Sequence, residues 1–166
     1  IFSSSTSFAG DENQTAIGTV TGSDADGDDS LSFTVSGSEL VITSAGVLSF
    51  ASAPDYETKT SYTAIVTMTD GLTSLDQSIS VNVNNLNDNS PVFTSDATLS
   101  LAENQTAIGT ITASDADGDS LTFTVSGSEL VITSAGVLSF ASAPDYETKT
   151  SYTATLTITD GVYSGT

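Results

Sequence analysis

The sequence predicts an all-β protein built from two tandem Greek-key β-sandwiches of seven strands each, the second of which lacks its last strand. Two observations carry this prediction: a long internal repeat, and short runs in which every second residue is apolar. Alternation of this kind indicates strands with one buried face, and no stretch keeps a helical period. About seven such runs per copy, separated by glycines, are typical of a sandwich domain of roughly 100 residues.

The repeat divides the chain into two copies. Glu12–Thr19 recurs unchanged as Glu103–Thr110, and Phe33–Ala64 recurs unchanged as Phe123–Ala154. A period of about 90 residues is too long for a solenoid unit and suits a whole domain. The predicted parts are a first repeat over residues 1–84, a linker over residues 85–91 and a second repeat over residues 92–166.

The alternating runs predict the strands of each copy. In the first copy they are Leu31/Phe33/Val35, Leu48/Phe50, Tyr62/Ala64/Val66/Met68 and Ile79/Val81/Val83. The last run has no complete counterpart, because only Val162–Thr166 follows Asp160-Gly161 in the second copy. We therefore expect the second copy to lack its final strand and to present an open sheet edge beside Leu156 and Ile158.

Composition excludes several classes of function. The chain carries 21 acidic residues against two basic ones, so a net charge of −19 repels nucleic acid and anionic membrane surfaces. Cysteine is absent, which excludes disulfides and thiolate metal sites. The sequence has no run of 18 apolar residues, so no membrane insertion is predicted. Hydrophobic residues make up 37% of the chain and are regularly spaced, which favours a folded core over disorder.

Most of the acidic residues lie in short clusters that recur in both copies or fall in the linker. These acids are Glu12, Asp24, Asp26, Asp55, Glu57 and Asp70 in the first copy, Asp88 in the linker, and Glu103, Asp115, Asp117, Asp145, Glu147 and Asp160 in the second. Two carboxylates about 5 Å apart repel by roughly 3 kcal/mol at an effective dielectric constant of about 20. Close acids in loops therefore indicate a bound cation, and the alternative is a solvated acidic surface.

The available ligand atoms are all oxygens, because the chain has neither histidine nor cysteine. Carboxylates, amides and carbonyls in irregular loops favour Ca²⁺ over zinc, copper or magnesium. The string Asp24–Asp28 invites comparison with an EF-hand loop. That interpretation fails, since the sixth loop position is Asp29 and not glycine, the twelfth is Val35 and not glutamate, and strands flank the loop.

The order of these motifs resembles that of a cadherin repeat, and the resemblance covers both copies. The motifs are Glu12-Asn13, Asp24-Ala25-Asp26, Asp55-Tyr56-Glu57, Asp70 and the linker Asn87-Asp88-Asn89-Ser90-Pro91. The near-identical copies and the Ser/Thr-rich, Lys/Arg-poor composition are similar to the bacterial cadherin-like repeats of very large surface proteins. The resemblance implies an extracellular location, at the cell surface or secreted, with neighbouring repeats as partners.

Calcium is bound between successive cadherin domains, so the resemblance also implies ligand sets. An outer ion would take Glu12, Asp55, Glu57 and Asp88. A middle ion would take Glu12, Glu57, Asn85, Asp88, Asp117 and the carbonyl of Leu86. The ion nearest the second repeat would take Asn89, Asp115, Asp117, Asp160 and the carbonyl of Asn87. Half-sites at the chain ends would comprise Asp24, Asp26 and Asp70, and Glu103, Asp145 and Glu147.

One position departs from the family pattern. The linker of the family begins with Asp, whereas this chain has Asn85, so the middle site is expected to be weaker or empty. The chain also has no tryptophan, which excludes the exchange of an N-terminal tryptophan between vertebrate cadherin partners.

The predicted function is that of a calcium-stiffened structural extender or adhesion repeat. The alternative is a calcium-dependent binding module for polysaccharide or for identical chains. An enzyme is not predicted. The pair Asp55 and Glu57 could serve glycoside hydrolysis in principle, but duplicated acids beside a linker suit metal binding better. The absence of histidine and cysteine also excludes Ser-His and Cys-His nucleophile systems.

Overall fold

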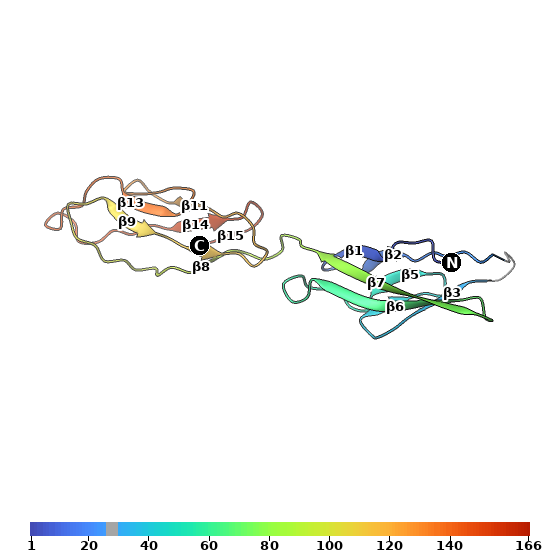
Figure 1. Ribbon diagram of the computed structural model, residues 1–166. Helices are drawn as coiled ribbons and strands as arrows, with labels where there is room; N and C mark the ends of the chain where they lie inside the picture. The colour runs from blue at the N-terminus through green and yellow to red at the C-terminus, as the bar shows by residue number, and fades with distance from the viewer. Residues whose placement is uncertain (26–29) are drawn as a thin grey trace. The chain divides into compact units, whose positions relative to one another are not determined.

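The computed structural model describes residues 1–25 and 30–166, and strands are the regular elements of this part of the chain (Figure 1). It contains no helix there, and hence none long and apolar enough to cross a membrane. The chain divides into two compact units, Ile1–Leu86 and Asn87–Thr166. The all-β prediction is confirmed, and each unit is a sandwich of short strands.

Seven strands lie in the described part of the first unit. They are β1 (Ser7–Asp11), β2 (Ala16–Thr19), β3 (Ser32–Val35), β4 (Leu40–Ile42), β5 (Val47–Phe50), β6 (Ser61–Thr69) and β7 (Ser74–Asn84). One sheet has the order β1-β7-β6-β3 and the other the order β2-β5-β4. The pair β1–β7 is parallel and the other pairs are antiparallel. β7 therefore lies between β1 and β6, with main-chain pairing on both sides.

The alternating residues of these strands form the core between the two sheets. The buried apolar residues are Val20, Phe33, Leu40, Leu48, Phe50, Val66, Met68, Ile79, Val81 and Val83. Strand β7 alone contributes three of them, with exposed fractions of 3%, 0% and 5%. Because fully burying one such side chain stabilises a fold by about 1.5–3 kcal/mol, β7 is a large part of the core as well as a central strand.

The second unit repeats this plan in part, and its last two strands are shorter than those of the first unit. They are β8 (Val92–Phe93), β9 (Ala107–Thr110), β10 (Ala113–Ser114), β11 (Thr122–Val125), β12 (Leu130–Ile132), β13 (Val137–Phe140), β14 (Leu156–Thr159) and β15 (Ser164–Gly165). Its sheets have the orders β10-β8, β11-β14-β15 and β12-β13-β9. Its buried apolar core is small and consists of Ile111, Leu138 and Ile158.

The last strand of the second unit is present only as its first two residues. β15 pairs with β14 through Thr159 and Ser164, which is the register in which Thr69 meets Ser74 in the first unit. The prediction that this strand is missing is thus refined: its start is formed, whereas β7 has 11 residues.

An identical stretch of sequence behaves differently in the two units. Ser61–Ala64 lies in β6 and pairs with β7, but the same four residues at 151–154 form no strand. Leu40 and Phe50 are 3% and 2% exposed, whereas their counterparts Leu130 and Phe140 are only half-buried. Since the local sequence is the same, strand formation and burial here depend on the partner strand.

The counterpart of β1 is also not formed, and there the sequence differs as well. Leu101 occupies the position of Gly10, where an added Cβ would lie 2.7 Å from Cε2 of Phe50. A leucine on the same path would collide with Phe140, the counterpart of Phe50. Residues 98–102 form no strand, and Leu99 and Leu101 are 48% and 41% exposed.

Amide hydrogen exchange should report this difference directly. Residues 61–64 and 151–154 share their sequence and the preceding threonine, so their intrinsic exchange rates match. We expect the amides of 151–154 to exchange more than about tenfold faster, because they lack the ladder to a neighbouring strand. Exchange followed by NMR or mass spectrometry tests this, and equal protection of the two stretches would contradict the fold described above.

Candidate metal centre

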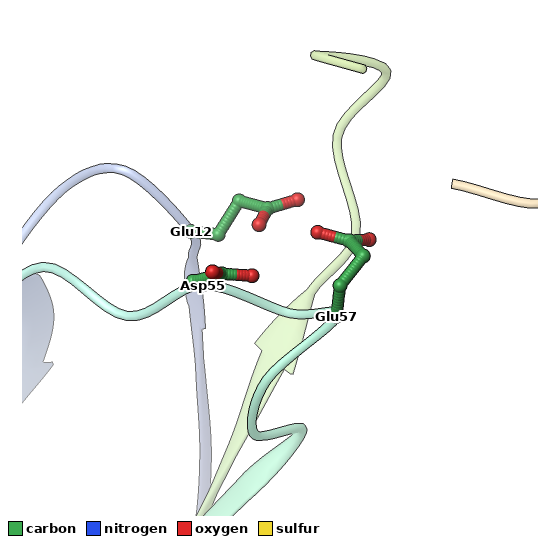
Figure 2. A group of neighbouring side chains, drawn as sticks. All are labelled: Glu12, Asp55 and Glu57. Carbon is green, nitrogen blue, oxygen red and sulfur yellow. The ribbon is translucent and has the colours of Figure 1, made fainter. Parts of the chain in front are cut away.

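Three predicted ligands meet in the first unit. Glu12 follows β1, while Asp55 and Glu57 lie in the loop before β6, and one carboxylate oxygen of each lies within 4.8 Å of the others. Figure 2 shows the three carboxyl groups pointing toward one another from these two segments. The structure therefore brings together the acids that the two motifs of the first repeat supply.

Glu12 is the buried anchor of this group. It is 1% exposed, and its Oε2 accepts a hydrogen bond from the N–H of Tyr56 at 2.8 Å. Its Oε1 accepts a second bond from the N–H of Leu86 at 2.7 Å, so Glu12 ties the 55–57 loop to the start of the linker. Each carboxylate oxygen keeps a further lone pair for a cation.

Asn13 explains why the motif is Glu-Asn. Its φ is 62°, in the left-handed region, and the φ of Asn104 in the second copy is 63°. Asparagine enters this region more readily than most residues because its short polar side chain bonds locally. The turn at Asn13 redirects the chain directly after β1, which leaves the Glu12 side chain in the interior.

In the second unit Asp117 holds the predicted linker ligands. Its Oδ2 accepts hydrogen bonds from the N–H groups of Asp88 and Asn89 at 3.0 and 2.9 Å. Its Oδ1 accepts a bond from Nδ2 of Asn89 at 2.8 Å, and its own N–H donates to Oδ1 of Asp115 at 3.0 Å. The structure thus gathers three of the predicted ligands around the carboxylate of a fourth, Asp117.

Three side-chain oxygens on residues of one predicted ligand set are buried without a hydrogen-bond donor. They are Oδ1 of Asn87, Oδ2 of Asp115 and Oδ2 of Asp160. A buried polar atom without a partner costs roughly 1–3 kcal/mol, and more when it is charged. Oxygens in this condition are suited to a cation. The resemblance to cadherin repeats implies the main-chain carbonyl of Asn87 as a ligand, and its side-chain oxygen is a further candidate.

The two copies treat the late aspartate differently. In the first unit, Oδ1 of Asp70 accepts bonds from the N–H groups of Leu72 and Thr73, and its Oδ2 accepts one from the Thr73 hydroxyl at 2.7 Å. These bonds, those of Thr73 foremost, lower the pKa of Asp70 to about 2. In the second copy Tyr163 replaces Thr73 and cannot supply that hydroxyl.

Asp160 consequently keeps one oxygen unpaired. Its Oδ1 accepts bonds from the N–H groups of Val162 and Tyr163 at 2.6 and 2.7 Å, while its Oδ2 has no donor. Burial acts to raise the pKa of Asp160, but those N–H groups and the side chain of Asn87 hold it below its ordinary value. The carboxyl therefore stays ionised and available to a cation at neutral pH.

Asp119 is a candidate ligand that sequence reasoning missed. One oxygen each of Asp115, Asp117 and Asp119 lies within 4.8 Å of the others. Gly118 has a φ of +81°, which allows the turn that brings alternate aspartates together. The signal was present in the sequence as three aspartates at a spacing of two, and it was set aside with the EF-hand interpretation.

The predicted half-sites are placed in part. Glu103, Asp145 and Glu147 gather in the second unit as Glu12, Asp55 and Glu57 do in the first. Glu103 accepts a bond from the N–H of Tyr146 at 2.9 Å but is less buried than Glu12. Of the other half-site, Asp24 is half-buried and Asp70 is bonded within its own turn, while Asp26 lies outside the described residues.

Both lysines of the chain form ion pairs outside these clusters. Lys59 pairs with Glu39 and lies 4.2 Å from the ring centroid of Tyr62. Lys149 pairs with Glu129 at 2.5 Å and lies 4.5 Å from the ring centroid of Tyr152.

With a donor set made only of oxygens, the residues of both clusters fit Ca²⁺, a hard cation that takes six to eight oxygen ligands in flexible geometry.

Comparisons with known proteins support the fold. Residues 87–165 match the bacterial Ig domain family. No curated protein matches the sequence. Among solved structures, the chain is similar to human protocadherin-24 EC1-2, with a TM-score of 0.72 and 20% identity over 92% of this chain and 81% of that one.

Two longer cadherin structures are equally similar. Drosophila N-cadherin EC1-4 gives a TM-score of 0.74 and 22% identity over 97% of this chain and 46% of that one. Mouse cadherin-23 EC22-24 gives a TM-score of 0.75 and 23% identity over 97% of this chain and 59% of that one. The chain thus spans about half of these two structures. By its fold, it is a tandem of cadherin-like repeats whose second repeat matches the bacterial Ig domain family.

Proposed function

We propose that the chain is a calcium-dependent extender or adhesion segment of a bacterial cell-surface protein, in which Ca²⁺ stiffens the junction between repeats. The observation that carries this proposal is the set of buried oxygens without donors on Asn87, Asp115 and Asp160. Nearly all buried polar atoms in proteins have a hydrogen-bond partner, so three unpaired oxygens on residues of one predicted ligand set are best explained by a bound cation.

The linker is the element on which calcium would act. Glu12 binds the N–H of Leu86 in the first unit, and Asp117 binds the N–H groups of Asp88 and Asn89 in the second. The acid clusters of both units therefore hold parts of one short segment. When bound, Ca²⁺ offsets the repulsion between these carboxylates and adds coordination that bending of the linker must break.

The proposed setting is extracellular, with neighbouring repeats of the same protein as the first partners. The cadherin-like fold and the bacterial Ig match support this setting. Millimolar extracellular calcium suits modules that bind it at about 10⁻⁴ to 10⁻³ M. No catalytic role is proposed, since the paired acids are accounted for by metal binding.

Binding of polysaccharide or of identical chains is the second candidate. It is favoured by Tyr146, whose side chain is 63% exposed and could stack on a sugar ring. A glycan array probed with the intact chain in calcium, with Tyr146→Ala as the control, distinguishes it from the extender. Loss of a glycan signal on this substitution would establish the binding role.

Calcium should stabilise the chain against heat. At 10 mM Ca²⁺ we expect the melting temperature of the second unit to rise by roughly 5–15 °C relative to chelator, given the typical affinity of such sites and their small size. Asp115→Asn should abolish most of this rise, because it removes a charged ligand. Asp96→Asn, which removes the same charge outside the clusters, should keep it. Calorimetry tests both, and an equal rise in the two variants would sink the proposed site.

A threonine hydroxyl at position 163 should compete with calcium for the carboxylate of Asp160. Tyr163→Thr would give Asp160 the donor that Thr73 gives Asp70, so we expect calcium affinity to fall roughly three- to tenfold. Tyr163→Val introduces a side chain of the same shape as threonine but without its hydroxyl, and this variant should bind calcium as the parent does. Isothermal titration measures both variants. A Tyr163→Val variant as weak as Tyr163→Thr would assign the effect to the lost ring instead.

Junction stiffness should depend most on Asp117. Its carboxylate meets two linker N–H groups and belongs to two of the predicted ligand sets, whereas Asp160 belongs to one. Small-angle scattering should show a larger maximum dimension in millimolar calcium than in chelator, and Asp117→Ala should reduce it more than Asp160→Ala. A maximum dimension unchanged by chelator would defeat the extender mechanism while leaving calcium binding itself intact.

A further inference from the structure

The first and last strands of the first unit are parallel neighbours. β1 pairs with β7 over five residue pairs, from Ser7 opposite Ser80 to Asp11 opposite Asn84. The chain enters this unit before β1 and leaves it after β7 toward residue 87, and Figure 1 shows the two strands side by side. Tension between the two ends of the unit therefore pulls β1 and β7 in opposite directions along a shared axis.

This direction of load puts the pair in shear. The hydrogen bonds of a parallel pair are evenly spaced along the strands, so sliding one strand past the other strains all of them together. A load across the ladder would instead break them one after another. The lifetime of a fold under force is set by its unfolding barrier, and this barrier is higher when the bonds must break together.

Further hydrogen bonds reinforce the pair at both of its ends. At the start of β1, the N–H of Ser80 donates to the carbonyl of Thr6 at 2.9 Å. At the other end, Nδ2 of Asn84 donates to Oδ1 of Asp11 at 2.8 Å, and the N–H of Glu12 donates to the carbonyl of Asn84 at 3.2 Å. The ladder is thus strengthened at the two places where separation of the strands would begin.

The β1–β7 pair is also the place where the unit would yield under tension. β7 is held on its other side by β6 over nine residue pairs, whereas β1 lies at the edge of its sheet. Before β1, Phe2 and Gly22 form an isolated bridge, which is too small to carry the load. The five pairs between β1 and β7 therefore determine how much tension the unit withstands.

We propose that the β1–β7 pair is a shear clamp that carries tension through the first unit. The inference rests on the proposed extender role, since an extender transmits force along its chain. The bond between Asp11 and Asn84 strengthens the clamp at the end from which β7 is pulled. Ala102 occupies the position of Asp11 in the second copy, so this bond is a feature of the first repeat.

Single-molecule force spectroscopy on the full 166-residue chain tests the clamp. Because the chain has no cysteine, handles can be attached through pairs of introduced cysteines at exposed positions. Ile1→Cys with Ser90→Cys loads the first unit in shear, whereas Ile1→Cys with Leu72→Cys places both handles before the paired stretch and peels β1 from β7. At the same constant force in chelator, the unit should survive at least about tenfold longer in shear. Equal lifetimes in the two directions would overturn the proposal.

Two matched substitutions separate the clamp from general stability. Asp11→Ala removes the bond to Asn84 across β1–β7, and Asp76→Ala removes the 2.6 Å bond from the Thr67 hydroxyl across β6–β7. Asp11→Ala should shorten the lifetime in shear at least about threefold, while Asp76→Ala should leave it unchanged. A similar shortening by both would assign the resistance to overall stability and overturn the clamp. If Asp11→Ala fails to fold, the two pulling directions without this substitution decide the question.

The pulling experiments are made in chelator, so their outcome is separate from that of the calcium experiments. Equal lifetimes in the two directions would remove the clamp and leave the extender mechanism standing. A maximum dimension that calcium does not change would remove the extender mechanism, while a longer lifetime in shear would still support the clamp.

Discussion

The pairing of β7 with both β1 and β6 is the interaction on which the first unit depends. It closes one sheet, places three fully or nearly buried aliphatic residues in the core, and ends at the point where Glu12 binds the linker. The second unit serves as an internal comparison, because much of its sequence is identical. In the second unit β15 has two residues. There, residues 151–154 form no strand although their sequence is unchanged, and Leu130 and Phe140 are only half-buried.

The charge distribution is governed by a second constraint, which acts at the loops. The sequence has two basic residues, and both pair with glutamates away from the acid clusters. Backbone N–H groups organise the clusters, because they donate hydrogen bonds to the carboxylates of Glu12, Asp117 and Asp160. N–H donors satisfy some of the carboxylate oxygens, and the remaining ones define the positions suited to a cation. Fold and site are thus linked through the main chain of the loops.

The sequence was sufficient to predict the fold class and the acid clusters. Alternation and the repeat predicted the strands. The resemblance to cadherin repeats placed Glu12, Asp55 and Glu57 in one ligand set, and their carboxylates lie together in the structure. Three features could not be predicted from local pattern. Residues 151–154 read as strand but need a partner strand to become one. The difference between Asp70 and Asp160 depends on a hydroxyl three residues away. Asp119 was missed because its spacing to Asp115 and Asp117 suggested only an EF-hand loop, which the sequence excludes.

That hydroxyl has a wider meaning for an array of such domains. With threonine at this position both oxygens of the aspartate are bonded within its own turn, and with tyrosine one oxygen has no donor. Under the proposed function, two domains that are otherwise nearly the same would fill with calcium at different concentrations. In a chain that contains both kinds of copy, the junctions would stiffen at different calcium concentrations. Single side chains would then grade flexibility along the molecule, and the whole chain would not stiffen at once.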